Sequence, residues 1–173
     1  EGALMALVAA GEADAGGEAL FALILVGSPG RPLGDILREQ LAGNAAFEPV
    51  REEAERAIDT IESGERVDGE TMSPELAPLF RPPVQDFLID LFALDPPAML
   101  AALELPVMIV QGERDVQVSA DNAERLAEAS PEATLLLLPE ANHVLKSVPA
   151  NDRAANVAAY GDPSLPLAAG AVE

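Results

Sequence analysis

The sequence predicts an α/β fold in which about three parallel strands are joined by crossover helices. This prediction rests on three short apolar runs, each followed by residues typical of turns. The runs are ALFALILV (19–26), PVMIV (106–110) and ATLLLL (133–138). Apolar runs of this length are typical of strands buried on both faces, as in parallel sheets. We therefore expect three buried strands whose C-terminal ends open into loops.

The segment between the second and third runs predicts a crossover helix. Ser119 suits the N-cap position, apolar Ala123, Leu126 and Ala127 share one face, and Pro131 follows them. A strand, a helix and a strand in this order form a βαβ unit, which places the C-terminal ends of both strands at the same edge of the sheet. Ligand sites of such sheets lie at that edge.

The opening stretch EGALMALVAA predicts a helix that lacks the capping residue expected before its first turn. Leu4, Leu7 and Val8 recur at helical spacing among alanines, which favour helix. No N-cap residue precedes the run, and the chain does not begin with Met. We expect that a segment normally preceding this helix is missing here.

Residues 27–105 contain no convincing strand and predict a helical insertion between two core segments, 1–26 and 106–173. The stretch REEAERAIDTIESG (51–64) predicts a charged, exposed helix, and two further helices are expected on either side of DPP (95–97). Four of the five phenylalanines fall in the insertion. They could line a lid over an apolar substrate or pack the insertion's own core, and the sequence leaves both possibilities open.

Composition excludes several classes of function. The chain has 173 residues, of which 49% are hydrophobic, enough for one domain with a core. Thirty acidic against ten basic side chains give a net charge of −20, which would repel a nucleic acid. The chain has no cysteine, and its acidic residues show no metal-ligand spacing, so we expect no metal and no cofactor. The apolar runs are shorter than the ~20 residues that span a membrane.

Two polar residues follow neighbouring predicted strands. Asp115 comes after the second strand in PVMIVQGERDVQV, and His143, the only histidine, comes after the third in LLLLPEANHVLKSVP. A crossover helix and a strand separate them, so both side chains should emerge at the same edge of the sheet. A carboxylate beside an imidazole fixes the tautomer of the ring and stabilises its protonated form. This pair predicts a general base and its orienting acid.

These stretches, with EGALMALVAA, resemble the C-terminal portion of an α/β-hydrolase. In that family the catalytic triad runs Ser, Asp, His along the chain, and the serine lies in G-x-S-x-G between a strand and a helix. Glu1 and Gly2 match the last two positions of that motif. The resemblance implies that the nucleophile would be the residue before Glu1, and that the backbone N–H of Glu1 would donate to the oxyanion.

The resemblance implies a serine hydrolase acting on small-molecule esters or amides, of esterase, lipase or aminopeptidase-like type, with residues 27–105 as a lid. The chain as given would be inactive because its nucleophile is missing. Ser28, in GSPG, has only half of the motif and is interpreted as a turn residue. Asp121 is assigned to the first turn of the crossover helix rather than to the catalytic pair. Two alternatives stay open: a non-catalytic, partner-dependent piece, and a dehalogenase-like member with an aspartate nucleophile.

Overall fold

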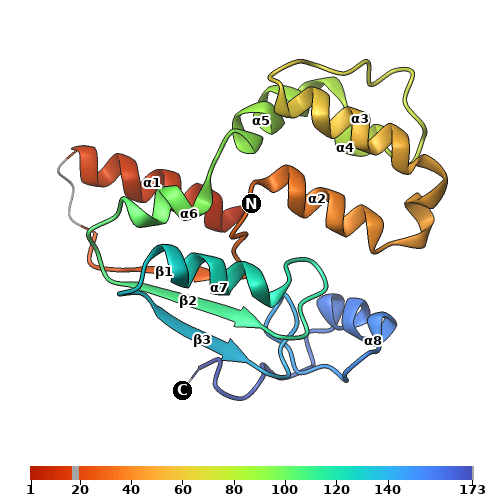
Figure 1. The fold of residues 1–173 in the computed structure, drawn as a ribbon. Helices are drawn as coiled ribbons and strands as arrows, with labels where there is room; N and C mark the ends of the chain where they lie inside the picture. Colours follow the sequence, from red (N-terminus) through yellow and green to blue (C-terminus); the bar gives the residue numbers. More distant parts are fainter. Residues whose placement is uncertain (17–19, 173) are drawn as a thin grey trace. The chain divides into compact units, whose positions relative to one another are not determined.

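A computed structural model describes residues 1–16 and 20–172 of the chain (Figure 1). The chain divides into two compact units. The sheet unit comprises Glu1–Arg31 and Pro96–Glu173, and the helical unit comprises Pro32–Asp95.

The elements alternate as expected for an α/β chain. The strands are β1 Leu23–Val26, β2 Val107–Gly112 and β3 Thr134–Leu138. The helices of the sheet unit are α1 Gly2–Gly16, α6 Pro96–Ala101, α7 Ala120–Ala129, α8 Arg153–Ala158 and the 3₁₀ turn η2 Ala159–Gly161. Those of the helical unit are α2 Leu33–Ala42, the 3₁₀ turn η1 Ala45–Val50, α3 Arg51–Glu62, α4 Ala77–Phe80 and α5 Pro82–Phe92.

The three strands form one parallel sheet in the order β1-β2-β3, which confirms the predicted strands and crossovers. Leu25 pairs with Ile109, and Ile109 pairs with Leu135, so the C-terminal ends of all three strands lie at one edge. β1 begins at Leu23, four residues after the predicted start at Ala19, and Ala19 itself lies outside the described residues.

One face of the sheet is covered by helices. α1 contacts β1, α7 contacts β2 and β3, and α6 contacts both helices, as Figure 1 shows. Leu7 of α1, Leu100 of α6 and Leu126 of α7 meet Leu25 and Ile109 of the strands in one buried cluster. Burying such side chains contributes about 1.5–3 kcal/mol each, so this cluster fixes the helices on the sheet.

The opposite face is covered only in part, which corrects the prediction of strands buried on both faces. Near β3, Val110 and Leu138 pack against Ala168 of the C-terminal segment. Towards β1, in contrast, Ile24 is 62% exposed, and Met108, its partner in the register, is 36% exposed. In this chain, a continuous apolar run correctly predicts a strand, but it does not predict that both faces of the strand are buried.

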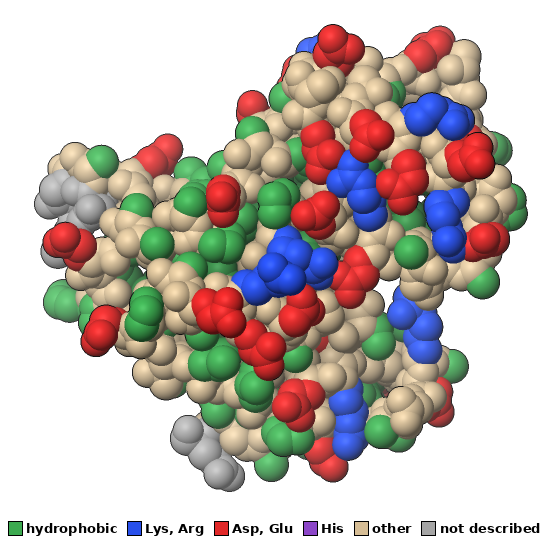
Figure 2. Space-filling model, in the orientation of Figure 1, with side chains coloured by type: hydrophobic (Ala, Val, Ile, Leu, Met, Phe, Trp, Pro, Cys, Tyr) green, Lys and Arg blue, Asp and Glu red, His purple; other side chains and the backbone are tan. Residues whose placement is uncertain are grey.

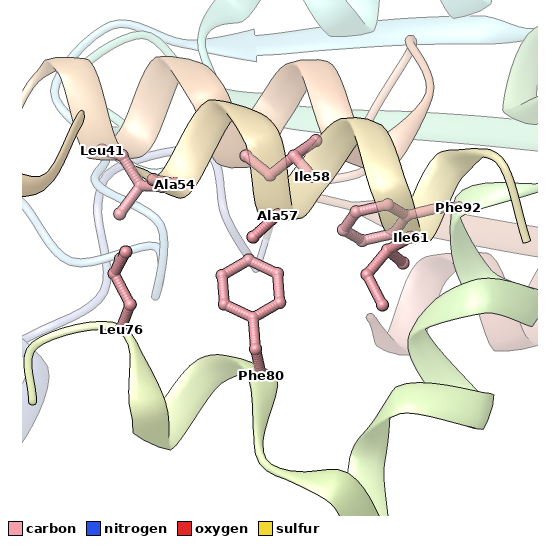
Figure 3. Packing of buried hydrophobic residues seen from close by; sticks show 8 residues of the cluster. All are labelled: Leu41, Ala54, Ala57, Ile58, Ile61, Leu76, Phe80 and Phe92. Atoms are coloured by element: carbon pink, nitrogen blue, oxygen red, sulfur yellow. The ribbon is translucent and has the colours of Figure 1, made fainter. Parts of the chain in front are cut away.

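The helical unit has a core of its own, in which the ring of Phe80 points from α4 towards Ala57 of α3 (Figure 3). Phe92 also belongs to this cluster, Phe47 packs against it, and Phe87 is 43% exposed. Most phenylalanines of the predicted insertion thus pack its own core. The helical unit is shorter than the predicted insertion, because residues 27–31 and 96–105 belong to the sheet unit. A lid function for this unit stays a prediction.

Many of the acidic side chains that give the chain its negative charge lie on its surface. Figure 2 shows Asp and Glu side chains spread over the visible face, with fewer Lys and Arg side chains between them. Across residues 1–16 and 20–172, helices of the length and hydropathy needed to span a membrane are absent.

Candidate active site

The loops after β2 and β3 are held together by backbone hydrogen bonds that continue beyond the strands. Glu113 N–H donates to the Leu138 carbonyl and Arg114 N–H to the Ala141 carbonyl, both at 3.0 Å. Gly112 permits this approach, because a Cβ there would lie 2.3 Å from the Ala141 oxygen, far inside van der Waals contact. The two loops that carry the predicted acid and base are therefore neighbours by construction of the sheet.

Asp115 and His143 meet at this edge. Nδ1 of His143 lies 2.7 Å from Oδ2 of Asp115. The Asp115 side chain is fully buried, whereas 29% of the His143 side chain is exposed. Because a carboxylate only accepts hydrogen bonds, Nδ1 carries the proton, and Nε2 is left as the basic nitrogen of the neutral ring. The structure thus brings the two predicted residues together.

The Asp115 carboxylate is held by donors on both oxygens. Oδ1 accepts from the backbone N–H groups of Gln117, at 2.7 Å, and Val118, at 3.0 Å. Oδ2 accepts from the Gln111 amide, at 3.2 Å, in addition to His143. Charge-assisted bonds of this kind are stronger than neutral ones, so the carboxylate has one well-defined orientation towards the ring.

Asn142 closes the loop that presents His143. Its side-chain oxygen accepts from the backbone N–H groups of Val144, at 3.2 Å, and Lys146, at 3.0 Å, and its amide donates to the Asn156 carbonyl. Asn142 is completely buried. Because buried polar groups cost free energy unless they are bonded, these contacts stabilise a single loop conformation.

The end of β1 completes the arrangement. Gly27 N–H donates to the Val110 carbonyl at 3.0 Å, and the glycine has a φ of +56°, in the left-handed region. A Cβ at this position would lie 3.0 Å from Cε1 and 3.1 Å from Nδ1 of His143. All three strand ends therefore contribute to the surroundings of the imidazole.

The other two candidates, Glu1 and Ser28, form hydrogen bonds elsewhere. Glu1 precedes α1, where its carbonyl accepts from Met5 N–H at 3.1 Å, and within the described residues no hydrogen bond joins it to Asp115 or His143. Ser28 follows β1 but is 1% exposed, and its hydroxyl approaches the Pro29 carbonyl at 3.4 Å. A hydroxyl so enclosed has no open approach for a substrate in this chain.

Asp121 belongs to the start of α7, as the sequence indicated. Its carboxylate accepts from the Ser119 hydroxyl at 2.6 Å and pairs with Arg125 at 3.4 Å. The Ser119 bond, followed by the charge of Arg31 and the contact with Arg125, holds the pKa of Asp121 below its usual value, although partial burial opposes this shift. Asp121 is therefore a helix-terminus acid.

Tyr160 is the tyrosine near this region. Burial raises the pKa of its phenol, and the neighbouring Gln117 side chain opposes that shift. The negative charge of Asp115 raises the pKa further. The phenol therefore stays protonated, and it does not compete with His143 as a base at neutral pH.

A cavity of about 590 Å³ is lined in part by Asp115 and its neighbours in the loop after β2. Its lining includes Glu113, Arg114, Asp152, Arg153 and Asn156, but not His143. Among the residues that the structure describes, His, Asp and Glu side chains form no group of three or more that could hold a metal ion.

Three contributors were missed from the sequence: Gly27, Gln111 and Asn142. Gln111 had a signal, because it is a polar residue within an apolar strand and stands four positions before Asp115. Asn142 also had a signal, because it is a polar residue directly before His143. Gly27 had no local signal, since a glycine after a strand is ordinary turn chemistry.

No family model matches the sequence, and no curated protein matches it. Solved structures are similar to it. A hydrolase from Pseudomonas aeruginosa aligns with 82% of this chain and 54% of its own, at 20% identity and a TM-score of 0.46. An α/β-fold family hydrolase from Bacillus anthracis aligns with 82% and 58%, at 19% identity and a TM-score of 0.47.

A thermophilic esterase from Thermogutta terrifontis aligns with 80% of this chain and 54% of its own, at 21% identity and a TM-score of 0.43. The chain thus spans little more than half the length of these structures. The three parallel strands with their crossover helices match part of α/β-hydrolase structures.

Proposed function

We propose that this chain is part of an α/β-hydrolase that cleaves carboxylic ester or amide bonds of small molecules. His143 acts as the general base and acid, and Asp115 orients it. The observation that carries the proposal is the 2.7 Å contact between Nδ1 of the only histidine and a fully buried carboxylate at the C-terminal edge of a parallel sheet.

The geometry supports this assignment because each part has a separate role in proton transfer. Asp115 is fixed by four donors, so its charge is available to a protonated ring without rearrangement. His143 is partly exposed, so Nε2 can reach a reacting group. An imidazole held in this way takes a proton from a nucleophile and later gives it to the leaving group.

The nucleophile of the proposal is a serine immediately before Glu1, with a glycine two positions before that serine. This placement follows from the match of Glu1 and Gly2 to the end of G-x-S-x-G. The backbone N–H of Glu1 would then donate to the oxyanion, a contribution of roughly 3 kcal/mol per donor. An aspartate at the same place would give displacement at carbon, as in a dehalogenase, and not acyl transfer.

The experiment compares this chain with the longer product encoded by its source DNA. We expect the longer protein to hydrolyse a short p-nitrophenyl ester and to be labelled by a fluorophosphonate, while the chain alone does neither. Labelling of Ser28 in the chain alone would contradict the proposal. So would any upstream codon other than serine, and aspartate there would favour the dehalogenase-like alternative.

Variants of the longer protein test the roles of the pair. His143→Ala and Asp115→Asn should each lower kcat on the order of 10³- to 10⁴-fold, because the members of such a unit act together. Asp121→Asn is the matched control, since it removes a nearby carboxylate that bonds Ser119 and Arg125. The acid is wrongly assigned if Asp121→Asn is the damaging change and Asp115→Asn is harmless.

A second candidate is a partner-dependent piece without catalysis of its own. The observation that favours it is the apolar surface at β1, where Ile24, Val26 and Met108 are at least one-third exposed and no described strand pairs with the outer edge. Such an edge can pair with another polypeptide strand. Sedimentation of the chain alone should show self-association that Ile24→Lys reduces. A sharp monomer peak for the unmodified chain would argue against this candidate.

A further inference from the structure

The end of β1 lies against the edge of the His143 ring, and a side chain on Gly27 would make an unusually tight contact with that ring. A Cβ on Gly27 would meet Cε1 at 3.0 Å, Nδ1 at 3.1 Å and Oδ2 of Asp115 at 3.6 Å. We propose that Gly27 is a positioning residue: the missing side chain keeps open the space in which the imidazole lies against Asp115. Only the catalytic consequence of this inference rests on the proposed function.

The question is which group would move if a methyl group were added. β1 is held in the sheet, and Gly27 N–H itself donates to Val110 at 3.0 Å. Asp115 is completely buried, and three donors other than His143 hold it. The imidazole is 29% exposed and has open space on its solvent side. The ring is therefore the group that gives way.

A ring displaced by a few tenths of an ångström has a longer and weaker hydrogen bond to Asp115. That bond places the proton of the neutral imidazole on Nδ1, since the tautomer is set by the partner of the ring. As this bond weakens, the preference of the proton for Nδ1 falls towards the distribution that an imidazole has in water. A substitution at Gly27 should thus change the tautomer of a residue far away in the sequence while leaving the carboxylate in place.

The experiment uses ¹⁵N-labelled histidine in the chain as it exists. Because His143 is the only histidine, its two ring nitrogens give unambiguous signals at a pH where the ring is neutral. We expect the proton on Nδ1 in the unmodified chain and a shift towards Nε2 in Gly27→Ala. An unchanged tautomer in a folded Gly27→Ala chain would overturn the proposal.

Backbone strain has to be separated from the contact with the ring, because Gly27 has a positive φ. Gly64 is the matched control: its φ is +82°, and a Cβ there meets nothing within 4 Å. Gly64→Ala should lower the folding equilibrium constant through strain alone and leave the tautomer unchanged. Gly27→Asn adds a second variant, since Asn tolerates positive φ but is larger than Ala.

A double-mutant cycle gives a result even where Gly27→Ala folds poorly. In the His143→Ala background the ring is absent, so Gly27→Ala should lower the folding equilibrium constant only through the backbone strain at its positive φ. We expect its reduction of the folding equilibrium constant to be about tenfold smaller there than in the unmodified chain. Equal reductions in both backgrounds, or failure of the double variant to fold, would overturn the proposal.

These readouts are independent of hydrolysis. If the tautomer shifts as expected but the longer protein has no activity, Gly27 positions a pair that is not catalytic, and the proposed function fails alone. If the longer protein is active and the tautomer does not respond to Gly27→Ala, the present inference fails alone.

Discussion

The two units of the chain bury different kinds of side chain. The helical unit packs Phe80, Phe92 and aliphatic residues, and its one buried polar side chain among the described residues is Gln85. The sheet unit buries several polar side chains, which gather near the loops after its strands. They are Ser28, Gln111, Asn122, Asn142 and Asn156.

In the helical unit the buried polar side chain is fully hydrogen-bonded, whereas in the sheet unit one such side chain holds Asp115 at the expense of an unsatisfied oxygen. Gln85 is satisfied at both ends of its amide: it accepts from Val67 N–H and donates to the Val67 and Phe80 carbonyls. The amide nitrogen of Gln111 donates to Asp115 and to the Gly112 and Val118 carbonyls, but its oxygen is buried without a partner among the described residues. A buried acceptor left unsatisfied costs about 1–3 kcal/mol, so the sheet unit tolerates a loss of stability where it holds the carboxylate.

The largest effect is expected for Phe80→Ala. It removes a completely buried ring from the helical unit and should lower the free energy of unfolding of that unit by about 3–5 kcal/mol. Hydrogen exchange should report lost protection in α3 and α5 and retained protection in β2. Leu79→Ala, on the same helix but 36% exposed, is the control with a small effect. Equal loss of protection in β2 would mean that the two units unfold as one.

The next largest effect is expected at the two buried glutamines, one in each unit. Gln85→Met leaves three backbone groups without partners and should cost about 1–3 kcal/mol. Gln111→Met also takes a donor from the Gly112 and Val118 carbonyls, but it removes the unsatisfied oxygen, so it should cost less. Its main effect should appear in the His143 ring, through a looser Asp115. Urea unfolding and the imidazole ¹⁵N spectrum measure the two effects, and the reverse order of costs would refute this comparison.

A smaller effect is expected at Arg38, which connects α2 to α3. Its guanidinium bonds Glu62 at 2.7 Å, Glu55 at 3.0 Å and Asp59, and these contacts raise its pKa, the Glu62 bond most. Arg38→Met should cost about 1 kcal/mol at low salt and less in 1 M NaCl, because these partners are partly exposed and salt screens them. Arg56 pairs with Glu52 at 3.9 Å, and both side chains are exposed, so Arg56→Met should change the unfolding free energy measurably at neither salt concentration.

The smallest effect is expected from pH at Asp121. Its pKa is lower in the folded chain than its ordinary value of 3.8, so its contribution to stability is present above that value and is lost as the pH falls through the folded pKa. Asp121→Asn should therefore reduce stability by a few tenths of a kcal/mol at neutral pH, and the difference should vanish in strong acid. Urea midpoints at several pH values measure it, and a difference that grows with acidity would contradict the sign.

The sequence predicted those features that local patterns determine. Three strands, their crossover and the meeting of Asp115 with His143 follow from apolar runs and from the common edge of a parallel sheet. The prediction that β1 is buried on both faces was wrong, because burial depends on which elements cover a sheet and not on the apolar run itself. Gly27 could not be predicted, since its role depends on contacts with residues distant in the sequence.

The hydrogen bonds that join the loops after β2 and β3 also affect how such a chain can change over generations. The pair Asp115 and His143 is placed by backbone bonds and by Gly112, so its geometry does not depend on the exposed side chains beside it. Glu113 and Val144 are exposed neighbours in sequence of this machinery. Mutational drift at those two positions can alter the charge and shape around the imidazole while the pair itself is inherited unchanged.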